Sequence, residues 1–161
     1  MANITSLLAA SSGSSSRGRS PYMVENTIDL TATAISSTGG DTVQAITVPA
    51  GTKILAAGFE VVESATMNTG TNATASLGFT GGDVDEFVAT FDIDGASDGA
   101  YAPSIAITGD TVSASADTID LLFAGDGATY SAGKLRVYAI MMDVSTQGDT
   151  SADEVDRDTL A

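Results

Sequence analysis

The segment "KLRVYAIMMDV" (residues 134–144) is the clearest strand in the chain, and it decides the fold class. Side chains alternate between the two faces of a strand. One face would hold Leu135, Val137, Ala139 and Met141, and the other would hold Arg136, Tyr138, Ile140 and Met142. Both faces are largely apolar toward the C-terminal half of the segment. This pattern predicts either a central strand buried on both sides or a strand whose second face meets a neighbouring subunit.

Further segments upstream show strand patterns. Residues 24–34 alternate apolar and polar side chains with a period of two, and residues 73–79 do the same. The segment "KILAAGFEVVES" (53–64) is apolar on both faces, which predicts a strand covered from both sides. Clusters of Gly, Asp, Asn and Ser separate most of these segments, as turns require. The expected strands are 24–34, 42–49, 53–64, 72–79, 87–93, 105–114, 117–125 and 134–144.

This number of strands, with no convincing helical stripe, predicts an all-β chain. We expect a two-sheet antiparallel β-sandwich that is jelly-roll-like. An immunoglobulin-like sandwich is the alternative, although its Cys…Trp…Cys signature is missing. With 161 residues, of which 43% are hydrophobic, the chain is long enough for one domain with a sizeable core. The expected bulky core members are Phe59, Phe79, Phe87, Phe91 and Phe123.

Charge divides the chain into three parts. The formal net charge is −15, yet residues 1–23 hold two arginines and no acid. Residues 145–161 hold five acids against one arginine. We expect a Ser/Gly-rich docking arm over 1–23, a β-sandwich body over 24–144 and an acidic C-terminal tail over 145–161.

The arm contains "SLLAASSGSSSRGRSPY" (6–22), which fits an export signal badly. Such a signal places basic residues before a long apolar run, whereas Arg17 and Arg19 follow a short one. A chain rich in Ser and Gly buries too little apolar surface to fold alone. The segment is therefore either a flexible terminus or an arm that becomes ordered on a partner.

The composition also narrows the function classes. Without cysteine or histidine, the chain cannot form disulfides, a thiol nucleophile, a Ser-His-Asp triad or the usual zinc sites. Six basic residues against 21 acidic ones argue against a nucleic-acid partner, and the lack of a long apolar run argues against membrane insertion. Hydrolysis of a glycoside would need two carboxylates that face the same substrate. Glu60 and Glu63 lie three apart on an expected strand, which predicts that they point to opposite faces and cannot form such a pair. We expect neither an enzyme nor a cofactor.

Two acidic turns raise the question of a metal. The segment "DIDGASDG" (92–99) carries Asp92, Asp94 and Asp98, whose oxygens would suit calcium. An EF-hand loop that begins at Asp92 would need glycine and glutamate where Ser97 and Pro103 stand. Asp83, Asp85 and Glu86 form the second acidic cluster. Because Asp and Gly also make turns, we expect turns here rather than a bound cation.

Three stretches resemble small virion structural proteins of marine tailed bacteriophages, of the capsid cement or decoration type. They are "MANITSLLAASSGSSSRGRSPY" (1–22), "GFTGGDVDEFV" (78–88) and "DTIDLLFAGDGATYSAGKLRVYAIMMDV" (117–144). The resemblance implies a β-sandwich trimer that stabilises the major capsid shell from its outer surface. It also implies a place in the virion, assembly in the cytoplasm of the host bacterium, and no catalytic residues. The implied partners are the major capsid protein and other copies of the chain.

Two groups of site residues follow from this resemblance and from the strand pattern. The capsid-docking arm would use Leu7, Leu8, Arg17, Arg19 and Tyr22, with the leucines as apolar anchors and the arginines paired to capsid carboxylates. The oligomer interface, or a core strand in its place, would use Arg136, Tyr138, Ile140 and Met142.

A second function remains open from the sequence. A head fibre, or a tail or adhesin module, would bind a host-surface glycan through aromatic rings in a concave site. Tyr101 and Tyr130, both in Gly-rich segments, are the candidates for such a site. A secreted surface or matrix protein would also suit the acidic, cysteine-free composition, but the chain lacks a good export signal.

Overall fold

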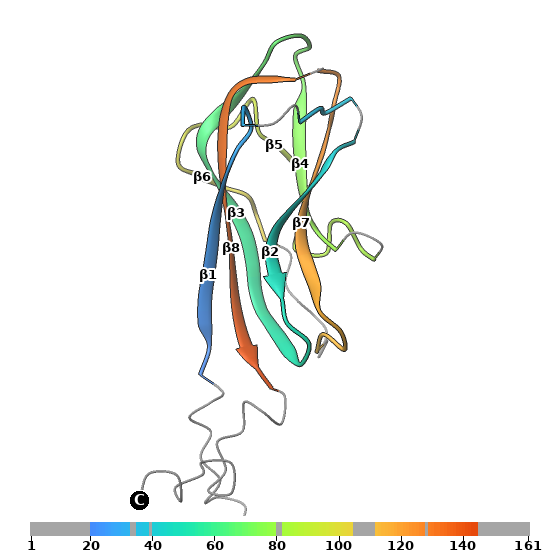
Figure 1. Cartoon of the computed structure of the whole chain (residues 1–161). Coiled ribbons are helices and arrows are strands. Elements are labelled where there is room, and N and C mark those ends of the chain that lie inside the picture. Colours follow the sequence, from blue (N-terminus) through green and yellow to red (C-terminus); the bar gives the residue numbers. More distant parts are fainter. Residues whose placement is uncertain are drawn as a thin grey trace, which may run out of the picture.

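The computed structural model describes residues 20–32, 35–38, 40–79, 82–104, 112–127 and 129–144. Within these residues the regular structure is entirely β, and Figure 1 shows its strands arranged in two layers. The strands are β1 (Tyr22–Asp29), β2 (Thr42–Val48), β3 (Thr52–Met67), β4 (Ala73–Gly78), β5 (Val88–Asp92), β6 (Ala100–Tyr101), β7 (Asp117–Gly125) and β8 (Tyr130–Asp143).

The two sheets have four strands each, and all their strand pairs are antiparallel. We call β1-β8-β3-β6 the first sheet and β2-β7-β4-β5 the second sheet. The chain crosses between the sheets at every connection except that from β4 to β5. This crossing order is that of a jelly roll, whereas an immunoglobulin-like sandwich pairs several consecutive strands within a sheet. The predicted jelly-roll-like sandwich is confirmed, and the immunoglobulin-like alternative is wrong.

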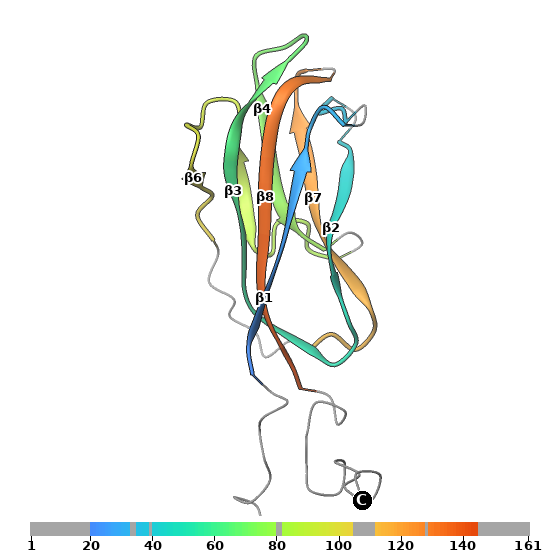
Figure 2. The same ribbon diagram turned by 60° about the vertical axis from the view of Figure 1, so that its left-hand side comes forward.

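Figure 2 shows the two sheets facing each other, and the buried apolar side chains of both form one core cluster. The four side chains predicted to share one apolar face of β8 point into this core. Leu135, Val137 and Ala139 are fully buried, and Met141 is nearly so. Of the predicted phenylalanines, Phe59, Phe87 and Phe123 are buried, while Phe79 and Phe91 pack at the margin of the core. Edge-to-face ring pairs join these layers, with 5.8 Å between the ring centroids of Phe59 and Phe91.

Some strand bounds differ from the sequence-based expectation. β1 ends at Asp29 rather than at residue 34, because the Asp29 carboxylate accepts a hydrogen bond from the Thr31 amide and closes a turn. Most of the expected strand 105–114 lies outside the described residues, and Val112 forms an isolated bridge to Lys53. The two-residue strand β6 lies in a segment that the sequence presents as a loop.

Burial on both faces, which was expected for 53–64 and was one of two interpretations for 134–144, is wrong for the single chain. β8 is central in its sheet, between β1 and β3, yet its outward side chains are only half-buried. On β3, Leu55 is 39% exposed and Val62 is 37% exposed. Within the described part of the chain, the first sheet has one covered face and one open face. The apolar character of its outward side chains is therefore not explained by the core.

One of the register shifts in β3 changes which side chains share a face. Val61 pairs with Leu135 and Glu63 pairs with Lys134, so Val62 is an extra residue at a β-bulge. The bulge brings Glu63 onto the same outward face as Glu60. The expectation that these carboxylates point to opposite faces is therefore wrong, because it assumed an uninterrupted strand.

Burial of Tyr130 makes the stability of the fold sensitive to alkaline pH. The Tyr130 ring packs against Phe123, and its hydroxyl is buried near Ser37 without a hydrogen bond of good geometry. Burial raises the pKa of Tyr130 to about 12 from its usual 10.0.

We expect the Tyr130 contribution to stability to be complete below pH 10 and to be lost between pH 10 and about 12, where the unfolded chain ionises first. Tyr130→Phe should remove this loss and leave stability at neutral pH nearly unchanged. Urea unfolding of both proteins at pH 8 and pH 11 would measure it, and an equal alkaline loss in the variant would contradict the account.

Candidate docking surface

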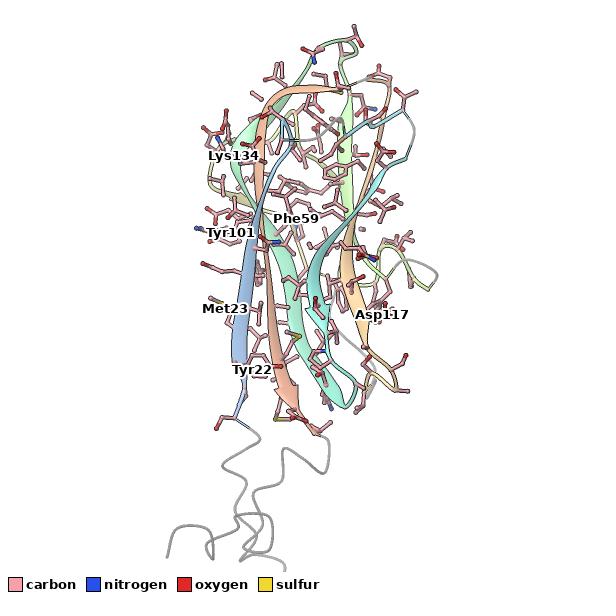
Figure 3. The ribbon with its side chains drawn as sticks, viewed as in Figure 1. Tyr22, Met23, Phe59, Tyr101, Asp117 and Lys134 are labelled. Carbon is pink, nitrogen blue, oxygen red and sulfur yellow. The ribbon has the colours of Figure 1, made fainter. Side chains whose placement is uncertain are left out.

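The open face of the first sheet, which we call the outer face, gathers the outward side chains of β1, β8, β3 and β6. Pairing across the strands sets its rows. From one end to the other, the rows are Met23–Ile140–Ala56, Glu25–Tyr138–Gly58, Thr27–Arg136–Glu60–Tyr101 and Asp29–Lys134–Glu63. In Figure 3, Met23, Tyr101 and Lys134 lie along this side, Phe59 lies between the sheets, and Asp117 lies on the second sheet.

One end of the outer face is apolar. Met23 is 62% exposed beside the half-buried Ile140, and Met142 lies one row further along β8. Most of the exposed large apolar side chains in the described part of the chain belong to the first sheet. They are Tyr22, Met23, Leu55, Val62 and Tyr101. Met23, Ile140 and Met142 lie together at this end, and exposed apolar side chains that lie together usually mark a contact with another molecule.

Two cross-strand ion pairs occupy the other end of the outer face. The Lys134 ammonium contacts the Glu63 carboxylate at 2.5 Å, and the Arg136 guanidinium donates a hydrogen bond to Glu60. Hydrogen bonding to Glu63, followed by its charge, raises the pKa of Lys134. Glu60 raises the pKa of Arg136 in the same way, and Tyr101 and Glu25 add smaller contributions. These pairs fix the orientation of the side chains more than they stabilise the fold, because their groups are partly exposed.

A shallow cavity of about 340 Å³ lies between the two ends. Its lining residues are Met23, Glu25, Glu60, Tyr101, Arg136 and Tyr138. The Tyr101 and Tyr138 rings meet edge to face, with 6.3 Å between centroids.

Gly58 sets the position of Tyr138 in this cavity. A β-carbon at Gly58 would lie 2.6 Å from the Tyr138 hydroxyl oxygen, so only glycine leaves room for the ring to lie across β3. The direct pairing of Gly58 with Tyr138 explains why the ring covers this position.

The second sheet has a different charge character. The described basic residues, Lys53, Lys134 and Arg136, all lie on β3 or β8. In the described strands and turns of the second sheet, all the charged side chains are acidic. They include Asp117 on β7 and the acids of the Asp83–Asp85 turn before β5. A hydrogen bond with Asp83 and its negative charge raise the pKa of Asp85. The outer face of the first sheet is therefore the described surface best able to meet another acidic protein without uniform repulsion.

The aspartates considered as calcium ligands bind backbone amides of this chain. Their carboxylates accept hydrogen bonds from separate backbone amides: Asp92 from Gly95, Asp94 from Ala73, and Asp98 from Ser64. No group of three or more acidic side chains in the described residues could hold a metal ion. The Asp92 contact closes a local turn, whereas Asp94 and Asp98 tie this segment to β4 and β3.

The structure brings one predicted group of site residues together. Arg136, Tyr138, Ile140 and Met142 share the outer face, as the alternation in β8 predicted. Sequence reasoning missed Met23, Glu25, Glu60 and Gly58, which only the strand register brings beside them.

Of the residues predicted for the capsid-docking arm, the structure describes only Tyr22. Leu7, Leu8, Arg17 and Arg19 lie outside the described residues. Tyr22 begins β1 and is 41% exposed, at the end of the sandwich where β8 finishes.

The two tyrosines proposed for a glycan site do not lie together on a surface. Tyr101 is 60% exposed and lines the cavity, but Tyr130 is only 5% exposed and belongs to the core. Tyr130 therefore has no free ring face on which a sugar could stack.

The described part of the chain also offers no helix with the length and apolar character that a membrane span requires.

Comparison with known proteins identifies the fold through solved structures. No protein-family model and no curated protein matches the chain. A chain in the capsid asymmetric unit of cyanophage Pam1 is 20% identical with a TM-score of 0.59, and the match covers 78% of this chain and 86% of that one. A chain in the capsid of Ralstonia phage GP4 is 18% identical with a TM-score of 0.57, and the match covers 79% and 86% of the two chains.

A third similar structure is the acid-stable capsid of the Helicobacter pylori bacteriophage KHP30. Its matched chain is 14% identical with a TM-score of 0.54, and the match covers 79% of this chain and 91% of that one. In all three cases most of both chains is matched, so the likeness concerns a whole small chain. This protein therefore has the same two-sheet β-fold as small chains found in three bacteriophage capsids.

Proposed function

We propose that this protein is a non-enzymatic structural protein of a bacteriophage virion, and that it is a cement or decoration protein. It would bind the outer surface of the shell formed by the major capsid protein, and stabilise that shell. The observation that carries the proposal is the match of nearly whole chains with small chains of three phage capsids. The resemblance of the sequence to virion proteins of marine tailed phages supports the same role, with assembly in the cytoplasm of the host bacterium.

The outer face of the first sheet would join copies of the chain into an oligomer, and a trimer is the proposed state. Ile140, Met142 and Met23 would form the apolar centre of this contact, with Tyr138 and Arg136 beside it. Each copy has a net charge of −15, so the contact forms against mutual repulsion. Screening by salt should therefore strengthen self-association rather than weaken it.

The arm would supply the contact with the shell. Residues 1–19 join the body next to Tyr22, at the end of the sandwich where β1 begins and β8 ends. Nineteen residues of extended chain reach about 60 Å, which is enough to cross onto neighbouring capsid subunits. Arg17 and Arg19 would pair there with carboxylates, and Leu7 and Leu8 would provide apolar anchors.

Deleting residues 1–22 is expected to leave the body folded and to abolish attachment to shells. The deletion removes only the first residue of β1, whose side chain is 41% exposed, so little core burial is lost. Rebinding of purified protein to shells that lack it, followed by co-sedimentation, would measure attachment, and circular dichroism would check the fold.

The matched variant Arg17→Ala/Arg19→Ala keeps the length of the arm and should weaken attachment less than the deletion does. Raised salt should mimic this variant, because exposed ion pairs are screened. Full decoration of shells by the truncated protein would show that the arm is only a flexible terminus.

The second candidate function is a fibre or adhesin that binds a host-surface glycan. The observation in its favour is the exposed Tyr101 ring at a cavity with convergent polar groups. Binding on a glycan array that disappears with Tyr101→Ala, while Tyr130→Phe binds normally, would support this candidate over a cement protein.

A further inference from the structure

We propose that the open edge of β1 pairs with the same edge of a second copy, so that the first sheets of the two copies join into one antiparallel sheet. This contact is made by backbone groups at the edge of the sheet, and it is distinct from the side-chain contact proposed for the outer face. It goes beyond the proposed function, because it does not depend on a place in the virion.

β1 is the outermost strand of the first sheet (Figure 1), and half of its backbone groups point away from β8. The Leu30 amide donates a hydrogen bond to the Gly133 carbonyl, and β1 pairs with β8 without a register shift. Since hydrogen-bonded residues alternate in an antiparallel pair, the even-numbered residues of β1 bond to β8. The amides and carbonyls of Met23, Glu25 and Thr27 therefore point outward, where no described strand pairs with them.

The other described edges of the two sheets have features that hinder pairing. β6 has only two residues, and β5 has five residues and pairs with β4 through a register shift. β2 has a bulge at Ala45, whose carbonyl accepts a hydrogen bond from the Asn26 side chain. Short strands, bulges, proline and lysine are the usual protection against edge pairing. β1 has eight residues, no bulge, no proline and no lysine, so it is the described edge most open to a second strand.

The sequence of β1 is self-complementary in one register. If Asn26 lies opposite Asn26 of the second copy, Glu25 lies opposite Thr27 and Asp29 lies opposite Met23. No acid then lies opposite another acid. Moving the centre of the pairing by one residue in either direction would place Glu25 opposite Glu25 or opposite Asp29, and like charges directly opposite each other are destabilising.

The inward side chains of β1 fit the same register. Val24 and Ile28 are half-buried, and each would pack against the other across the two-fold axis. Asn26 lies between them, and its side-chain amide donates one hydrogen bond to the Ala45 carbonyl. Its second N–H and its Oδ1 can pair with the same groups of the second copy. We expect this polar pair to fix the register, as an asparagine pair does in a coiled coil.

The contact is two-fold, so it cannot close a ring of three chains. If the outer face forms the proposed trimer, the pairing of β1 would join chains of neighbouring trimers. Each copy has a net charge of −15, and pairing at an edge buries little apolar surface. We therefore expect the pairing at about millimolar concentration, as on a crowded surface, rather than at micromolar concentration.

Disulfide cross-linking tests the register directly, because the chain contains no cysteine of its own. In the proposed register residue 26 forms a non-hydrogen-bonded pair with itself, in which the Cα atoms lie about 4.5 Å apart and within disulfide reach. Asn26→Cys should therefore give a covalent dimer on mild oxidation at millimolar concentration. Glu25→Cys, one residue from the axis, should cross-link more slowly. Gln44→Cys, at an exposed position of β2, should react only by random collision.

Thr27→Pro is the variant that separates edge pairing from folding. It removes an outward amide and leaves the hydrogen bonds between β1 and β8 in place, which is why proline is tolerated on edge strands. In the Asn26→Cys background it should abolish the covalent dimer, while circular dichroism stays unchanged. In the unmodified protein, hydrogen exchange at the amides of Glu25 and Thr27 should slow as the concentration rises, whereas the amide of Asn26 should be protected throughout.

Exchange at Glu25 and Thr27 that does not depend on concentration would overturn the proposal. So would faster cross-linking of Glu25→Cys than of Asn26→Cys, or a covalent dimer that survives Thr27→Pro. Protection of these amides only on shells would assign the edge to a strand of the capsid protein. Protection that is lost on deletion of residues 1–19 would assign it to the arm. Either result would overturn the assignment to a second copy.

The inference and the proposed function fail separately. Cross-linking and exchange are measured on the free protein, so a negative result leaves the virion role unaffected. Absence of the protein from virions would likewise leave the pairing of β1 unaffected.

Discussion

Replacing Ile140 with aspartate is expected to convert the proposed oligomer into a folded monomer. Ile140 lies at the apolar end of the outer face, between Met23 and Ala56, and contributes nothing to the inward face of β8. A carboxylate buried there by a second copy would have no partner. We expect the dissociation constant to rise by about 100-fold or more, which corresponds to about 3 kcal/mol. Sedimentation velocity at micromolar concentration would measure the change.

The matched control is Thr47→Asp. It introduces the same charge at an exposed position of β2, on the second sheet, and should leave the oligomer intact. Circular dichroism should be unchanged for both variants, since neither side chain lies in the core. If the unmodified protein is already a stable monomer at micromolar concentration, the outer face is not a contact between copies.

Replacing Phe59 with alanine is expected to cause the largest loss of stability. Phe59 is fully buried between the sheets and packs edge to face against Phe91. Such truncations leave a cavity and typically lower the free energy of unfolding by about 3–5 kcal/mol. Urea unfolding at a fixed protein concentration would measure this difference.

Leu55→Ala on the same strand is the control for this experiment. The Leu55 side chain is 39% exposed at a β-bulge, and its truncation should cost less than about 1 kcal/mol. Equal losses for Phe59→Ala and Leu55→Ala would mean that β3 does not divide its side chains between a core and an open face.

The sequence was sufficient for those features that depend on alternation within one strand. The inward and outward sets of β8 follow from a period of two, because no bulge interrupts the pairing of β8 with β1. The phenylalanine core followed from the same logic. The number of strands and the missing helical pattern were enough to predict a sandwich.

Features that depend on pairing between strands could not be predicted. Glu60 and Glu63 share a face only because Val62 forms a bulge, for which the sequence has no clear signal. The cavity needs Gly58 to stand opposite Tyr138 and Tyr101 to stand opposite Glu60. β6 has two residues, too few to show any periodicity. The open outer face appeared in the sequence only as an ambiguity between a buried strand and a contact with another molecule.

The most direct test of the central claim is quantitative mass spectrometry of purified phage particles. If the protein is a cement or decoration protein, it should be present in many copies per particle, in a fixed ratio to the major capsid protein. It should also remain after washing that removes loosely bound host proteins. Its absence from particles, or its presence in only a few copies, would contradict a role as a protein that covers the shell.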